Sequence, residues 1–122
     1  MTVLDILNSV KKRFPNTDAT EICQIVNELE KRFVGEIFSL CGLEVRTTPL
    51  NPEQDLNTPL LLENEHILIY VYYAYWALSV KEMDMDGANS FAGIFNERFV
   101  ALAIYYRRKY LPTKNTLLSG GV

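Results

Sequence analysis

The sequence predicts an all-α fold: a four-helix antiparallel bundle with a long proline-containing loop between the second and third helices. Apolar residues recur at spacings of three and four, which places them on one face of a helix. Proline, glycine and asparagine interrupt this pattern and divide it into four segments. The chain has 122 residues, 48% of them hydrophobic, which is enough for one domain with its own core.

The first helix is predicted over residues 3–13 and the second over residues 18–41. Thr17 or Asp18 is expected to cap the second helix, because both side chains can accept a hydrogen bond from the first turn. Gly42 is expected to end it. The apolar stripe of the second helix comprises Ile22, Ile25, Val26, Leu29, Phe33, Ile37 and Leu40.

Residues 43–62 contain three prolines, and Asn, Thr and Asp fill much of the rest, so this segment is predicted as a long loop. Loops of this length in compact domains tend to be functional or mobile. No basic residue occurs from Thr47 to Val80, whereas four acidic residues do. They belong either to a solvated loop and a helix N-terminus or to an acidic docking surface.

The third helix, predicted over residues 64–82, is apolar around nearly its whole circumference. A helix of this kind is buried on all sides. The preferred interpretation is that a second subunit covers part of it, with Tyr70, Tyr73 and Trp76 at the interface, since Tyr and Trp are enriched at such surfaces. The alternative is a central core helix whose tyrosine hydroxyls reach the surface.

The fourth helix is predicted over residues 87–110, before Pro112. It carries two apolar lines and ends in three adjacent cations, where positive charge suits the helix dipole. Tyr105, Arg107 and Arg108 extend the predicted interface onto this helix.

The stretch E-M-D-M-D-G at 82–87 is similar to the start of a calcium-binding loop. The twelfth position of such a loop should be a bidentate Glu, but it is Gly93, so no calcium site is expected. We instead expect Asp86 to cap the fourth helix and Gly87 to relax the backbone at the corner.

Residues 1–112 are expected to form a single helical domain, and residues 113–122 a flexible C-terminal tail. The tail contains the apolar pair Leu117 and Leu118. This pair is either disordered or lies on a neighbouring subunit.

Several functional classes are disfavoured. The net charge of −3 does not suit a general polyanion binder. The apolar run at 67–78 is shorter than the roughly twenty residues of a membrane span. His66 is the single histidine and no catalytic motif occurs, so we expect no enzyme, metal or cofactor. Cys23 and Cys41 are expected to be reduced and buried.

The second half of the chain carries a recognisable order of motifs. A leucine-rich lead-in at 60–62 precedes the tyrosine-rich helix, the acidic turn follows, then F-N at 95–96 and Y-Y-R-R at 105–108 before the proline. With N-E-L-E at 27–30, this order over residues 18–112 resembles the head–tail connector (adaptor) proteins of tailed bacteriophages that infect Gram-positive hosts. Phe91 departs from the pattern, since relatives often have Tyr followed by Asn.

The resemblance implies a helical virion protein, made in the bacterial host cytoplasm, that forms a homo-oligomeric ring at the head–tail junction. The ring would bind the portal protein and the stopper or tail proteins. DNA would pass through it without specific binding, and no membrane is involved. A tail terminator or another neck protein is a close variant. The alternative from another class is a small helical protein-interaction module or regulator of phage or bacterial origin.

Overall fold

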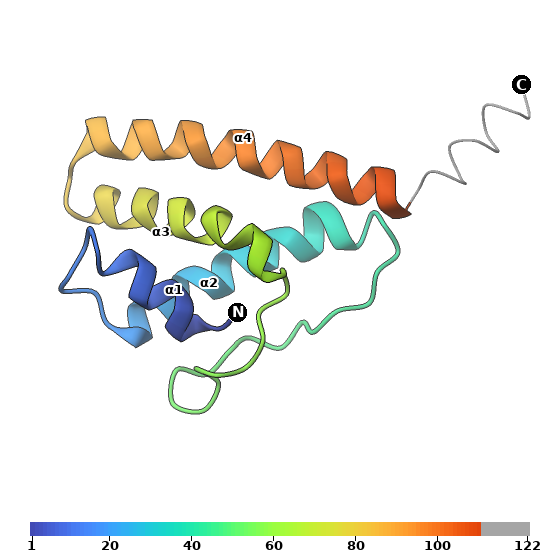
Figure 1. Cartoon of the computed structure of the whole chain (residues 1–122), viewed down its shortest axis with the longest axis horizontal. Coiled ribbons are helices and arrows are strands. Elements are labelled where there is room, and N and C mark those ends of the chain that lie inside the picture. The colour runs from blue at the N-terminus through green and yellow to red at the C-terminus, as the bar shows by residue number, and fades with distance from the viewer. Residues whose placement is uncertain (111–122) are drawn as a thin grey trace, which may run out of the picture.

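The computed structural model describes residues 1–110, and four α-helices account for most of them (Figure 1). They are α1 (Val3–Val10), α2 (Ala19–Phe33), α3 (Ile67–Lys81) and α4 (Met85–Tyr110). A π-helical turn, Val34–Phe38, extends α2, and a 3₁₀ turn, Asn64–His66, precedes α3. No strand occurs among the described residues. The predicted all-α class is therefore confirmed.

Side chains fix the beginnings of α1 and α2. Thr2 caps α1, and Asp5 returns the interaction by accepting a 2.9 Å hydrogen bond from the backbone N–H of Thr2. Asp18 caps α2 by accepting a 2.8 Å hydrogen bond from the backbone N–H of Glu21. Of the two caps considered from the sequence, Asp18 is thus the one used.

Gly42 ends the second helical segment, as predicted. Its φ is +68°, a left-handed conformation that suits glycine. The N–H of Leu43 donates to the carbonyl of Phe38 at 3.0 Å, and the N–H of Gly42 donates to Ser39 at 3.2 Å. These two bonds satisfy carbonyls at the helix end. The α-helical geometry itself stops earlier, at Phe33, which the apolar stripe did not indicate.

Helix α3 is the central helix of the fold. It contacts α1 and α2 on one side and α4 on the other, and α4 runs back along it after a short turn (Figure 1). The chain's own helices therefore cover most of α3. This favours the alternative of a central core helix, and the coverage of the remaining exposed part of α3 by a second subunit stays a prediction.

The turn between α3 and α4 differs in detail from the prediction. Helix α4 begins at Met85, and Asp84 rather than Asp86 caps it, since Oδ1 of Asp84 accepts a 3.0 Å hydrogen bond from the N–H of Gly87. Asp86 lies in the first turn, where its charge suits the helix dipole. A Cβ at position 87 would overlap the Asp84 carboxylate, so glycine here makes room for the cap.

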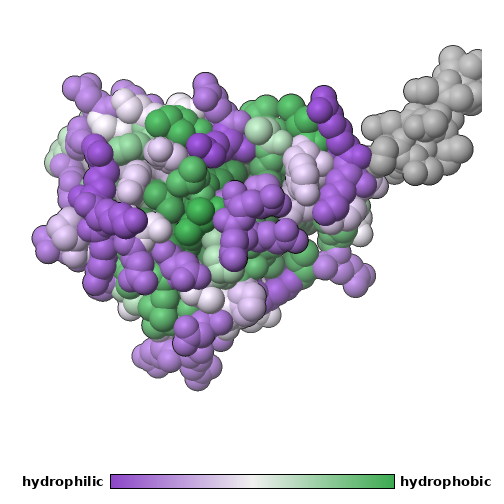
Figure 2. Space-filling model, in the orientation of Figure 1, coloured by the Kyte–Doolittle hydropathy of each residue, from purple (hydrophilic) through white to green (hydrophobic). Residues whose placement is uncertain are grey.

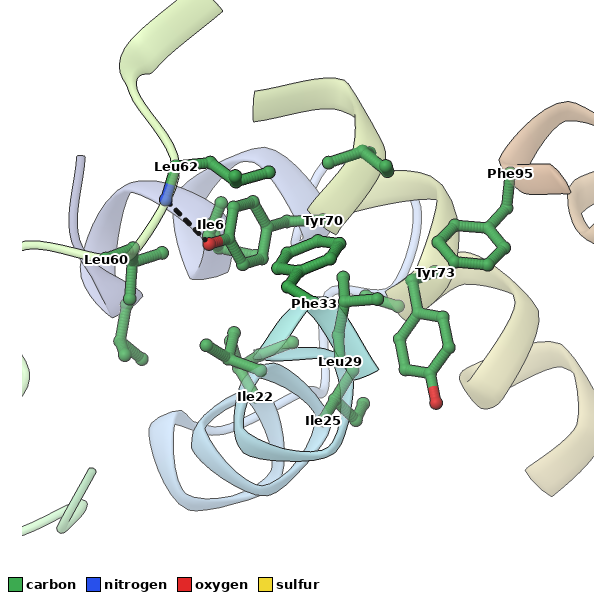
Figure 3. Close-up of a cluster of buried hydrophobic side chains, with 14 of the residues drawn as sticks. Ile6, Ile22, Ile25, Leu29, Phe33, Leu60, Leu62, Tyr70, Tyr73 and Phe95 are labelled. Atoms are coloured by element: carbon green, nitrogen blue, oxygen red, sulfur yellow. Dashed lines mark hydrogen bonds between the residues drawn. The ribbon is translucent and has the colours of Figure 1, made fainter. Parts of the chain in front are cut away.

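Residues 43–63, called the strap below, contain no α-helix but are firmly attached to α2. The side chain of Asn27 forms two hydrogen bonds to the backbone of Leu50, of 2.8 and 2.9 Å. Leu50, Leu60 and Leu62 are buried in the core. Figure 3 shows Leu60 and Leu62 beside the side chains of α2 and α3. The strap is therefore part of the folded core.

Candidate interaction surface

Tyr70 lies in the core and is only 1% exposed. Its hydroxyl donates a 2.7 Å hydrogen bond to Glu30. It also accepts a 3.3 Å hydrogen bond from the N–H of Leu62, which is the dashed line in Figure 3. Burial, reinforced by the carboxylate of Glu30, raises the pKa of Tyr70 above its usual value. A partner cannot reach this side chain in the folded chain, which corrects its prediction as an interface residue.

Tyr73 is also a core residue. Its ring is 8% exposed and packs against Trp76 and Phe95, with ring centroids 5.4 and 5.0 Å apart. Figure 3 shows its hydroxyl pointing away from Phe33 and Leu29. Burial raises the pKa of this hydroxyl. The interface prediction for Tyr73 is corrected in the same way, because its ring packs inside one chain.

The other predicted interface residues are distributed differently. Trp76 is half-buried and stacks on Phe95, and its role in an interface stays a prediction. Tyr105, Arg107 and Arg108 are exposed on α4, where a partner can reach them. Leu117 and Leu118 lie outside the described residues. Among the described residues, the predicted interface residues that a partner can reach therefore lie mainly on α4.

Helix α4 exposes apolar side chains on the side turned away from the core. Its buried residues, including Phe95, Leu102 and Tyr106, face α3 and α2. Val100 is nevertheless 57% exposed and Ile104 41% exposed. The exposed apolar group, called the α4 strip below, consists of Ile94, Val100, Ala101, Ile104 and Tyr105. Exposed apolar side chains that occur together on one element mark an interaction site more often than scattered ones do.

Figure 2 shows the hydropathy of the face seen in Figure 1. Hydrophobic residues reach the surface in the region of α3 and α4, between hydrophilic side chains. Leu68 and Val80 of α3 are 41% and 46% exposed and add to the apolar surface of this pair of helices. The α3–α4 pair thus contributes several exposed apolar side chains to this surface.

The C-terminal half of the α4 strip borders a shallow, open hollow of about 600 Å³, called the α4 hollow below. It is lined by Ala101, Ile104, Tyr105, Arg108 and Lys109. The ammonium of Lys109 lies 5.6 Å from the Tyr105 ring centroid, which helps to hold both side chains at the rim. Arg107, Arg108 and Lys109 form no ion pair with any described residue. The hollow therefore combines an apolar floor with unpaired positive charge.

A second hollow, of about 610 Å³, lies between the outer side of α2 and the strap. It runs beside the salt bridge of 2.7 Å between Arg46 and the buried Glu30. The same carboxylate also accepts a 2.7 Å hydrogen bond from the N–H of Leu61. The partners of Glu30 all belong to the chain itself, so this carboxylate acts as a structural clamp between α2, α3 and the strap.

The turn before α4 contains exposed residues that the sequence reasoning did not select. Met83 is 84% exposed and Met85 58% exposed. They alternate with the exposed acids Glu82, Asp84 and Asp86. The M-D-M-D pattern at a predicted turn was a sequence signal for this exposed surface. Only its acids were considered, as possible calcium ligands. We call residues 82–86 the methionine corner.

Two further findings bear on function. Within residues 1–110, no three His, Cys, Asp or Glu side chains are grouped so that they could hold a metal ion. None of the helices in this part of the chain is both long and apolar enough to cross a membrane.

Comparison of the chain with models of protein families, with curated proteins and with solved structures gave no match. A functional proposal therefore has to be built on the chain's own residues and surfaces.

Proposed function

We propose that the protein is a structural protein of a phage virion that forms a connector ring between the portal of the head and the tail or stopper. The observation that carries this proposal is the α4 strip with its rim of cations, which form no ion pair within residues 1–110. It includes the Y-Y-R-R segment at 105–108, which also belongs to the resemblance with phage connector proteins.

A ring requires each protomer to present two different surfaces that bind one another. The α4 strip supplies one apolar surface, on the longest of the described helices. In this proposal the protomer is an antiparallel four-helix bundle, and its proline-containing loop at 43–62 reaches a neighbouring protomer or the portal.

The proposed location is the head–tail junction of the virion, after synthesis in the host cytoplasm. DNA would pass through the ring without specific binding, which the net charge of −3 supports, because phosphate contacts by Lys and Arg supply most non-specific affinity for DNA. The portal and the stopper or tail proteins would be the lasting partners.

A second candidate function is a small helical module or regulator that binds one partner protein. One observation favours it: α3 is buried by helices of the same chain, so a single copy has a closed core. Such a chain can fold as a monomer and use the α4 strip for one partner alone.

Deletion of the gene from its parent phage or prophage tests the proposal. Negative-stain counting of the lysate should show separate heads and finished, unattached tails, with heads that leak DNA. A deletion rescued by the gene in trans is the control for effects on neighbouring genes. Intact, tailed and infectious virions in the deletion lysate would remove the structural proposal and favour the interaction module.

A further inference from the structure

We infer that the methionine corner of one copy docks on the α4 hollow of the next copy. The inference rests on the proposed ring and specifies its contact: the two surfaces that join neighbouring protomers are the opposite ends of the same α3–α4 hairpin.

The methionine corner is a projecting surface of defined shape. The N–H of Asp84 donates to the carbonyl of Ser79 at 2.9 Å, and that of Met83 donates to Val80 at 3.0 Å. These bonds hold Met83 in a left-handed conformation, with φ of 62° and 84% of the residue exposed. A projecting segment that is already ordered loses little entropy on binding. Methionine side chains adapt readily to an apolar surface.

The acids of the corner lack a cationic partner among residues 1–110, although Asp84 and Asp86 also stabilise the start of α4. Glu82, Asp84 and Asp86 form no ion pair with any described residue. The nearby cation Lys81 is paired with Glu21 of α2. The corner therefore offers two exposed methionines among three carboxylates.

The α4 hollow complements the methionine corner both in its apolar surface and in its charge. Its floor is formed by Ala101, Ile104 and the Tyr105 ring, which can take apolar side chains. Arg108 and Lys109 line its edge, and Arg107 is exposed next to them in the sequence, so the charge around the hollow is opposite to that of the corner. Complementary charges around an apolar contact speed association and fix its orientation.

The two surfaces cannot meet within one copy. Met85 and Ile104 lie nineteen residues apart on α4, which corresponds to about 28 Å along a helix at 1.5 Å per residue. A contact between them therefore joins two copies, and in the proposed ring it runs head to tail rather than reciprocally about a two-fold axis, where each corner would occupy the other copy's hollow. Such a contact closes into a ring or continues as a filament, whereas a two-fold symmetric contact stops at a dimer.

Two variants with opposite defects test the inference. M83N/M85N removes the apolar part of the corner, and Asn tolerates the left-handed conformation at position 83. I104D/R108E places acids in the hollow. All four residues are exposed, so both variants should unfold at nearly the wild-type temperature. L40D, at an exposed apolar residue outside both surfaces, is the matched control.

Mass is measured over a range of concentrations by sedimentation and light scattering. We expect the wild-type chain and L40D to form species larger than a dimer, and each corner or hollow variant alone to remain at 14.0 kDa. A mixture of the two variants retains one intact corner and one intact hollow. It should therefore give a species of about 28 kDa, twice the mass of one chain, and nothing larger.

Three results would overturn the inference. They are assembly of either variant like the wild type, failure of the mixture to form the 28 kDa species, and a wild-type chain that stays at 14.0 kDa or stops at a dimer of about 28 kDa. None of them decides the proposed function, because the particle count in the deletion lysate tests that function without any reference to this contact. Suppose that the deletion lysate contains unattached heads and tails and that one of these three mass results is also obtained. The proposed function then holds, and the ring contact lies elsewhere on the chain.

Discussion

The hydroxyl of Tyr70 donates a 2.7 Å hydrogen bond to the carboxylate of Glu30, forty positions earlier in the sequence. Both residues are buried, at 1% and 4% exposure. Glu30 also receives the guanidinium of Arg46 and the backbone N–H of Leu61. A buried carboxylate is tolerated only with such partners. This one joins α2, the strap and α3.

The first prediction concerns this hydrogen bond. Tyr70→Phe should lower the free energy of unfolding by about 1.5–3 kcal/mol, the range for a hydrogen bond to a charged group. Tyr75→Phe is the matched control, since its hydroxyl donates only a long, 3.5 Å hydrogen bond to Ser9. It should cost less than about 0.5 kcal/mol. Urea unfolding measures both, and equal losses would contradict the clamp.

The second prediction is loss of stability at alkaline pH. The pKa of Tyr70 is raised in the folded state, so its contribution is fully present below the usual tyrosine pKa of about 10. Above that pH the unfolded chain loses the proton while the folded chain keeps it. The free energy of unfolding should then fall, by at most about 1.4 kcal/mol per pH unit for this group.

Urea midpoints between pH 8 and pH 11.5 measure this slope. Burial also raises the pKa values of Tyr73, Tyr75 and Tyr106, so their contributions have the same sign. The Tyr70→Phe variant isolates the contribution of Tyr70, so its free energy of unfolding should fall less steeply with rising pH. The same slope in that variant would show that Tyr70 ionises equally easily in both states.

The third prediction separates the two acids at the start of α4. Asp84→Ala removes the cap and should cost about 1 kcal/mol. Asp86→Ala removes only a charge in the first turn and should cost about 0.3–1 kcal/mol, less in high salt. Thermal melting in low and high salt compares them. A larger loss for Asp86→Ala would restore the capping role that the sequence assigned to it.

The fourth prediction tests the reassignment of Tyr73. Tyr73→Ala should cost about 3–5 kcal/mol, because it leaves a cavity against Phe95 and Trp76. Tyr110→Ala, at a 40% exposed site, is the control and should change stability by less than about 0.5 kcal/mol. If the Tyr73→Ala variant melts like the wild type but fails to assemble, Tyr73 is an interface residue and its assignment to the core is wrong.

Much of the fold could be predicted from the sequence because it depends on local signals. Apolar periodicity, Asp18 and Gly42 located the second helical segment, since each acts within a few residues. The π-helical turn at Val34–Phe38 was not predicted, because apolar periodicity does not distinguish such a turn from a continuing α-helix. The cap at Asp84 was missed although its signal is local, since Gly87 makes room for the Asp84 carboxylate three residues away.

The candidate surface was predicted only in part, for a reason of packing. An all-apolar helix looks the same in sequence whether its own chain or a partner covers it, and α3 is covered by its own chain. Tyr105, Arg107 and Arg108 belong to the Y-Y-R-R segment of the resemblance, and they are exposed. The methionine corner was missed because exposure of Met83 depends on a tight turn with a left-handed residue.

The measurement that tests the connector proposal most directly is the position of the chain in the virion. A phage that carries an affinity tag at the N-terminus of this protein is purified by density, decorated with gold-labelled antibody and imaged. The account predicts one cluster of label at the head–tail junction of each particle and none on the capsid or tail tube. Infectious particles that contain none of the tagged chain would contradict it.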